Sequence, residues 1–417
     1  MITAGTISKN TGAKAVLPFY IYASLSFLAA CILLLINSGQ LKGQYFQPSI
    51  LAIVHTLALG WGTMMILGAG YQLVPVIAES TLYSEKLAIS SFVLAAIGIP
   101  LLVKGFYNFE FDLPALSGAI LIILSILCYL VNFGTTAVRS TKPNIETLFL
   151  FTAVLWLLLT VATGFLLLLN FSKDVLPFDS LHYLAWHSHM GIVGWFLLTV
   201  IGAASRLLPM FMLSKFSKPG LLWSVYILVN SGLILLTIKE INSVSSLSYY
   251  LPFTLIALGI CIFIYYAYRV TAARIRKSID KQMRLALASI ASLFVPVMIL
   301  AFCLITLNEA AVVRVYGFMI FFGWITAIII AMTFKTLPFI IWNRLYGGHA
   351  IAPLQPADLF SKGLYNSILC FYAAGLSVCV AGLACSNEIV ISAGAILLLV
   401  TAVLFNLCSF KLIFRSK

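Results

Sequence analysis

Twelve apolar runs, each near the length that crosses a bilayer, dominate the 417-residue sequence. A helix that crosses the hydrocarbon core needs roughly 20 predominantly apolar residues. Only 9% of the residues are charged, against about 25% in soluble domains, so the chain could not cover a water-facing surface. We therefore expect an all-α polytopic protein in a lipid bilayer, with about twelve transmembrane helices and with eleven or thirteen as alternatives. The runs lie near 16–36, 50–77, 88–106, 114–136, 147–170, 185–210, 221–238, 250–269, 284–307, 314–341, 365–385 and 388–413.

Basic residues in the loops indicate the orientation, because cytoplasmic loops carry an excess of Lys and Arg. With the amino terminus inside, 20 of the 25 Lys and Arg residues fall on the cytoplasmic side. This asymmetry explains the formal charge of +13 without a nucleic-acid partner. The basic segment 269–284 is expected to lie beside anionic lipid. We expect a multi-pass protein of a bacterial-type inner (cytoplasmic) membrane, with its amino and carboxyl termini both in the cytoplasm.

Three of the runs share an internal motif, which is the signature of a repeat. Each copy has Gly-Trp, then a Pro fourteen residues after the Trp, with a polar residue three before the Pro. The spacings between the Gly residues are 134 and 129 residues, which corresponds to four helices per unit. We expect one membrane domain over 1–417, with repeat units of roughly 16–136, 147–269 and 284–413. The motif residues are Gly60, Trp61 and Pro75; Gly194, Trp195 and Pro209; and Gly323, Trp324 and Pro338.

The motif residues also have ordinary structural explanations. Gly allows helices to pack closely, and Trp fits an aromatic belt at the membrane interface. Neither explains the fixed spacing of fourteen residues. The polar residue before the Pro is Gln72, Arg206 or Lys335 in the three copies. The two cations are expected to snorkel to the cytoplasmic surface.

Histidine is scarce, and three of the five histidines lie in motif helices. His55 and His189 both stand five residues before the Gly of Gly-Trp, and His187 precedes His189 by two. The third copy has Tyr316 and Phe318 at the matching positions. An ionisable side chain within a membrane helix is costly and is by default a functional hypothesis. A lone His could serve only an interhelical hydrogen bond, whereas a matched pair on two helices favours a metal or cofactor site.

Imidazole is the commonest metal ligand and the usual axial ligand of haem. Residues two apart on a helix point about 200° apart, so His187 and His189 cannot both chelate one ion from one face. They could serve adjacent sites, or one could ligate while the other makes a supporting hydrogen bond. His182 is expected at the membrane interface, and His349, in a loop, carries no functional weight.

Several other chemistries are disfavoured. No Asp or Glu lies in the central part of any run, which argues against a proton pump. The sequence has no phosphate-binding, dinucleotide-binding or nucleophile-elbow motif. Its eight cysteines include no CxxC pair, so neither a disulfide framework nor a thiolate metal site is indicated.

The sequence resembles subunit I of the haem–copper oxidase superfamily, in particular short bacterial proteins labelled cytochrome c oxidase subunit I-like. The resemblance implies three pseudo-symmetric groups of four helices, with His55 as a haem ligand and His187 or His189 as a copper ligand. The family's seventh-helix His pair is missing, and Tyr316-Gly317-Phe318 replaces its tenth-helix His-x-His, so dioxygen reduction is not implied. The resemblance is carried by HTLALGWGTMMILGAGYQLVP (55–75), WHSHMGIVGWFLLT (186–199) and VYGFMIFFGW with KTLPFIIW (315–342).

The leading hypothesis is a divergent member of this superfamily that binds haem, copper or both near the extracytoplasmic side. It would act in respiratory electron transfer, in the response to nitric oxide or dioxygen, or in metal handling, alongside other respiratory or redox membrane subunits. If it is an enzyme, it is an oxidoreductase. The WHSH element (186–189) is also similar to one in the NnrS family, which is linked to nitric oxide stress. The alternatives are a non-redox transporter or channel, and an assembly subunit that reuses the scaffold.

Overall fold

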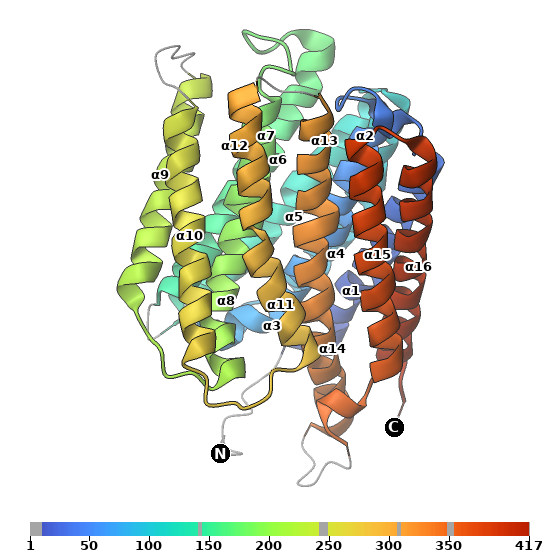
Figure 1. Cartoon of the computed structure of the whole chain (residues 1–417). Coiled ribbons are helices and arrows are strands. Elements are labelled where there is room, and N and C mark those ends of the chain that lie inside the picture. Colours follow the sequence, from blue (N-terminus) through green and yellow to red (C-terminus); the bar gives the residue numbers. More distant parts are fainter. Residues whose placement is uncertain (1–10, 141–143, 242–248, 307–309, 348–353, 417) are drawn as a thin grey trace.

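The computed structural model describes residues 11–140, 144–241, 249–306, 310–347 and 354–416. These residues contain twelve helices long and apolar enough to cross a membrane, and no strand (Figure 1). The predicted all-α polytopic architecture is therefore confirmed. Nine spans are α1 (Ala13–Ile36), α4 (Glu85–Asn108), α5 (Leu113–Val138), α6 (Ile145–Lys173), α9 (Pro219–Ile241), α10 (Tyr250–Ala272), α11 with α12 (Lys281–Ser292 and Phe294–Thr306), α15 (Lys362–Ala384) and α16 (Glu388–Ile413).

The other three spans are the motif helices, and each is interrupted by a π-helical turn. The first comprises α2 (Pro48–His55), a π turn (Thr56–Thr63) and α3 (Met64–Ile77). The second comprises α7 (Leu184–His189), a π turn (Met190–Leu197) and α8 (Leu198–Met212). The third comprises α13 (Ala310–Phe318), a π turn (Met319–Ile325) and α14 (Thr326–Tyr346). Short 3₁₀ turns at Gln40–Lys42 and Pro356–Asp358 complete the elements.

The π turns give the motif a structural meaning. Each turn starts one residue after His55, His189 or Phe318, at the same point of the three copies. π turns are rare and often occur at functional sites. The division of the whole chain into three four-helix units stays a prediction, but the motif helices share this irregularity at one phase.

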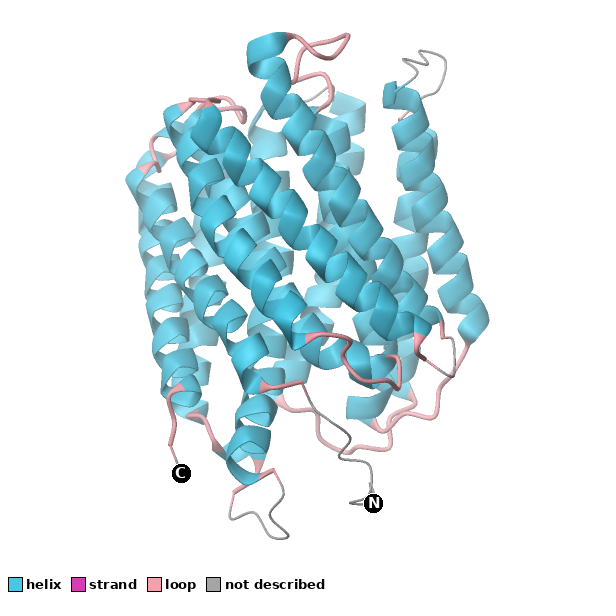
Figure 2. Ribbon diagram, turned by 180° about the vertical axis from the view of Figure 1, so that it is seen from behind, coloured by secondary structure: helices cyan, strands magenta, loops and turns pink. Residues whose placement is uncertain are grey.

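The motif helices form the centre of the bundle. In the most apolar stretch of each, 67% of the residues are buried, against 28–44% in the other spans. The remaining helices pack against them and against one another, and the view from behind shows the long helices side by side (Figure 2). Close packing of α4 on α5 depends on glycine, because a Cβ at either Gly98 or Gly118 would lie 2.7 Å from the carbonyl oxygen of the other.

A layer of three tryptophans crosses the middle of the bundle. Trp61, Trp195 and Trp324 are only 0%, 2% and 1% exposed, so the interpretation of these residues as an interfacial belt is wrong. The Trp195 indole N–H donates to Thr63 Oγ1 at 3.0 Å. A buried indole needs such a partner.

The hydrogen-bond pattern of this layer is cyclic but incomplete. Trp61 donates to Thr326 Oγ1 at 3.2 Å, so each acceptor stands two residues after a motif Trp. The Trp324 N–H has no partner. The position two residues after Trp195, which would accept its hydrogen bond, is Leu197.

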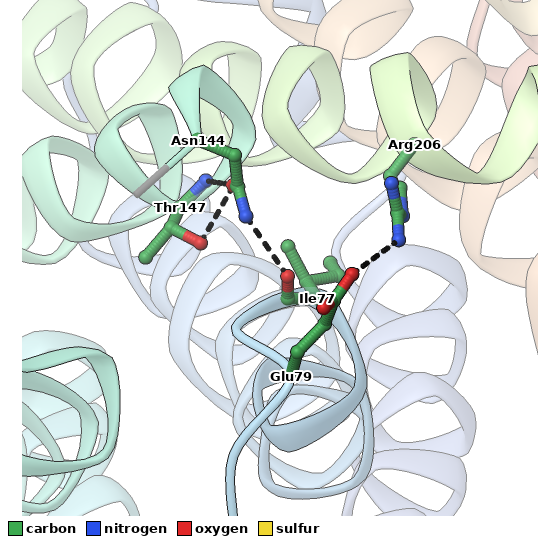
Figure 3. A network of polar contacts seen from close by, with 5 residues as sticks. All are labelled: Ile77, Glu79, Asn144, Thr147 and Arg206. Atoms are coloured by element: carbon green, nitrogen blue, oxygen red, sulfur yellow. Dashed lines mark hydrogen bonds and ion pairs between the residues drawn. The ribbon is translucent and has the colours of Figure 1, made fainter. Parts of the chain in front are cut away.

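At the Pro ends of the motif helices, polar contacts join neighbouring spans. Figure 3 shows Arg206 of α8 facing Glu79, which follows α3, at 3.4 Å. In the same view, the Asn144 side chain donates to the Ile77 carbonyl at 3.0 Å. The same side chain accepts from the Thr147 backbone and so caps α6 (Figure 3).

Lys335, the equivalent cation of the third motif helix, lies 2.5 Å from Asp280, which caps α11. The expectation that this lysine snorkels to the surface is wrong, because it is only 19% exposed and paired within the bundle. In the first copy, the Gln72 Oε1 atom is buried without a partner.

Candidate functional site

A large apolar cavity lies between the halves of the motif helices that precede the Trp layer. Its volume is about 620 Å³, within the range of small-molecule and cofactor sites. His55, His187 and His189 all line it, so the structure brings the three predicted site residues to one space. A smaller cavity of about 140 Å³ lies on the other side of the layer, and Trp195 borders both.

His55 is the last residue of α2, and its ring is held from two sides. It stacks on Phe106 of α4, with ring centres 4.2 Å apart. Its Nδ1 atom lies 2.8 Å from the Leu51 carbonyl oxygen. A carbonyl only accepts hydrogen bonds, so Nδ1 carries the proton and Nε2 keeps a free lone pair.

His187 approaches α6 at a glycine. A Cβ at Gly164 would lie 2.9 Å from the His187 Cε1 atom, so only glycine leaves room for the ring in this position. The Nδ1 atom of His187 is buried and has no hydrogen-bond partner. A buried nitrogen without a partner is costly, and a bound group would satisfy it.

His189, two residues later, has both ring nitrogens engaged. Nδ1 lies 2.7 Å from the Ala185 carbonyl oxygen, and Nε2 lies 3.2 Å from the Tyr316 hydroxyl. Because Nδ1 is the donor to Ala185, the Tyr316 hydroxyl donates to Nε2. The structure thus separates the two neighbours: His187 has an unsatisfied nitrogen, and His189 is occupied by hydrogen bonds.

The two histidines with uncommitted nitrogens lie near each other. The ring centres of His55 and His187 are 6.5 Å apart, and the ring planes are inclined by 21°. A metal–imidazole bond is about 2.0–2.1 Å long, so two imidazoles on opposite sides of one metal atom have ring centres roughly 6 Å apart. The separation suits a metal-containing group with two axial imidazole ligands.

A metal ion held by three or more protein ligands fits less well. Across the part of the chain that the structure describes, no group of three or more His, Cys, Asp or Glu could hold an ion. Haem needs only one or two axial ligands from the protein, because its own nitrogens supply the rest. The donor set and the apolar walls therefore match haem better than a closed copper site.

The remaining histidines lie elsewhere. The His182 side chain is 40% exposed, lies 3.6 Å from Glu240 and does not line the cavity. His349 falls outside the described residues.

Sequence reasoning missed three residues of the site. Tyr316 matches His187 in motif phase, and this position could have marked it as a polar partner. Arg314 also lines the cavity, but nothing in its spacing indicates this. Gly164 could not be predicted as a site residue, because its role depends on how α6 packs against His187.

Comparison with models of known protein families and with curated proteins gave no match.

Proposed function

We propose that this chain is a haem-binding redox protein of the membrane, in which His55 and His187 would hold the haem iron. The observation that carries the proposal is the pair of imidazoles with uncommitted nitrogens, 6.5 Å apart in a cavity of about 620 Å³. The resemblance to subunit I of the haem–copper oxidases supports the part of the proposal that concerns His55, which it also assigns to a haem, whereas it assigns His187 or His189 to copper.

Haem would supply one-electron redox chemistry at this position. The residues of the chain would hold and orient it. The Leu51 carbonyl fixes the tautomer of His55, and a hydrogen bond of this kind makes an imidazole a better ligand. Phe106 limits the rotation of the same ring. The walls of the cavity are mainly apolar.

If His55 and His187 both held the iron, a gas would have no place to bind to it, so the site would favour electron transfer. Transport is a weaker candidate, since the buried Trp layer separates the two cavities and the Trp61 and Trp195 side chains within it are hydrogen-bonded. A role beside other respiratory or redox subunits and a location in a bacterial-type inner membrane, with both termini cytoplasmic, belong to the same proposal.

The test is a haem titration of the chain purified in detergent, followed by its Soret absorption and by metal analysis. We expect binding of one haem per chain. His55→Ala and His187→Ala should each weaken binding by about 100-fold, because each removes an axial ligand. His182→Ala is the matched control and should bind as the wild type does.

Gly164→Ala tests the position of His187 without removing it. The added methyl group would displace the ring, and we expect haem affinity to fall by about tenfold with little change in the fold. A wild-type chain without Soret absorption after haem addition would refute the proposal. Copper retained in place of haem, and lost in both His variants, would reassign the two imidazoles to a copper site.

A further inference from the structure

Arg314 is the one residue with a permanent charge among the described residues that line the large cavity. It lies on α13, at the end of the cavity farther from the Trp layer. Its guanidinium donates to the Gly43 carbonyl oxygen and, at 3.2 Å, to the Ser386 hydroxyl. The Nε atom is buried without a partner.

Those two hydrogen bonds connect α13 to the loops that contain Gly43 and Ser386, so Arg314 also stabilises the packing of these segments. Both acceptors are neutral, however, and no acidic side chain in the described part of the chain forms an ion pair with Arg314. The carboxylate of Glu388, near Ser386 in sequence, is taken by Lys42 at 2.7 Å. Arg314 is only partly buried, so its guanidinium is accessible to a ligand, and its buried Nε atom still lacks an acceptor.

We propose that Arg314 binds the carboxylate of a lipophilic molecule that occupies this cavity. A guanidinium has five N–H donors in a planar fork that matches a carboxylate, and the two hydrogen bonds of Arg314 use only part of it. The cavity then has two matched parts, apolar walls for the body of the ligand and one cation for its acidic edge. The inference rests on the proposed function where the ligand is haem, since haem carries two carboxylates.

The first experiment compares iron protoporphyrin with its dimethyl ester, which keeps the ring and metal but has no carboxylate. Both are titrated into the purified wild-type chain. A charge-assisted hydrogen bond is strong enough that we expect the diester to bind at least about tenfold more weakly. This comparison needs no variant, so it does not depend on how a substitution affects folding.

Variants then assign the preference to one residue. In Arg314→Gln the acid and the diester should bind alike, whereas Arg314→Lys should keep part of the preference. Lys173→Gln removes an exposed cation at the end of α6 that does not line the cavity, and should leave the preference unchanged. Thermal unfolding of each variant checks that the bundle is intact. Equal affinity for acid and diester in the wild type, or a preference that survives Arg314→Gln, would overturn the inference.

A second arm separates this inference from the proposed function. If neither porphyrin binds, haem is excluded, and a fluorescent long-chain fatty acid is compared with its methyl ester. Selective binding of the acid that depends on Arg314 would keep the carboxylate site and identify an acyl ligand. Equal binding of acid and ester, or binding of neither, would overturn it.

Discussion

The first two motif helices and the third begin from the same Gly-Trp and Pro pattern but differ in the residues before the π turn. His55 and His189 stand at this phase in the first two helices, and Phe318 replaces them in the third. Phe318 is buried and stacks on Phe322, so this position belongs to the core. The third helix instead contributes Tyr316, which donates to His189.

Packing at the motif glycines shows the same division. A Cβ at Gly60 would lie 2.7 Å from Ser26, and one at Gly194 would lie 2.6 Å from Trp156. At Gly323 the nearest atoms would be 3.7 Å away, which is ordinary contact. The glycine is therefore required in the first two helices and not in the third.

The comparison teaches that one repeated helix can serve two roles. We interpret the first two copies as the helices that present ligands, packed tightly so that their imidazoles are fixed. The third copy supplies polar side chains around the cavity and is packed more loosely at its motif glycine.

The largest expected effect on stability comes from the motif glycines. Gly194→Ala should lower the free energy of unfolding by about 1–3 kcal/mol, because the methyl group overpacks against Trp156. Gly323→Ala should leave it unchanged or raise it by up to about 1 kcal/mol, since alanine favours helix more than glycine does. Equilibrium unfolding in mixed detergent measures both. Equal losses in the two variants would remove the packing difference between the copies.

Substitutions in the incomplete Trp layer should change the free energy of unfolding by less. Removing an acceptor should lower it, and adding the missing acceptor should recover part of a loss. Thr63→Val and Thr326→Val should each cost about 1–2 kcal/mol, because each leaves a buried indole N–H without an acceptor. Leu197→Thr should offset part of its lost apolar burial by accepting from Trp324, whereas Leu197→Val cannot. The measured quantity is the difference in unfolding free energy between these two Leu197 variants. A threonine variant less stable than the valine variant would contradict the cyclic pattern.

The smallest effect concerns the ion pairs at the Pro ends. Burial raises the pKa of Asp280, but hydrogen bonds from Lys335 and the Met283 backbone, with the charges of Lys335 and Arg276, hold it below its ordinary value. A carboxyl with a lowered pKa contributes stability that is present above about pH 4 and is lost as the pH falls through the folded-state pKa.

Asp280→Asn should therefore lower stability by about 1 kcal/mol at pH 7 and reduce the loss of stability below about pH 4. Glu79→Gln, in the half-exposed pair with Arg206, should cost less than about 1 kcal/mol. Thermal unfolding scans across this pH range compare the two variants. A wild-type pH profile that Asp280→Asn does not alter would show that the pair contributes nothing to the fold.

The helices and the motif phase could be predicted because they depend on local patterns, namely apolar runs and repeated spacing. The burial of the motif tryptophans could not, since the belt rule applies to tryptophans that face lipid and burial depends on which helices surround them. Which of His187 and His189 has a ring nitrogen free to bind a ligand could not be predicted from the sequence either. It depends on Gly164, on a different helix, and on Tyr316, more than a hundred residues away.

The most direct measurement is the electron paramagnetic resonance spectrum of the ferric, haem-loaded chain. We expect the low-spin spectrum of haem with two imidazole ligands in the wild type and in His189→Ala. His55→Ala and His187→Ala should each convert the haem they retain to a high-spin form. A high-spin wild type, or a low-spin spectrum that survives the loss of either His55 or His187, would contradict the assignment of these two residues as the axial pair.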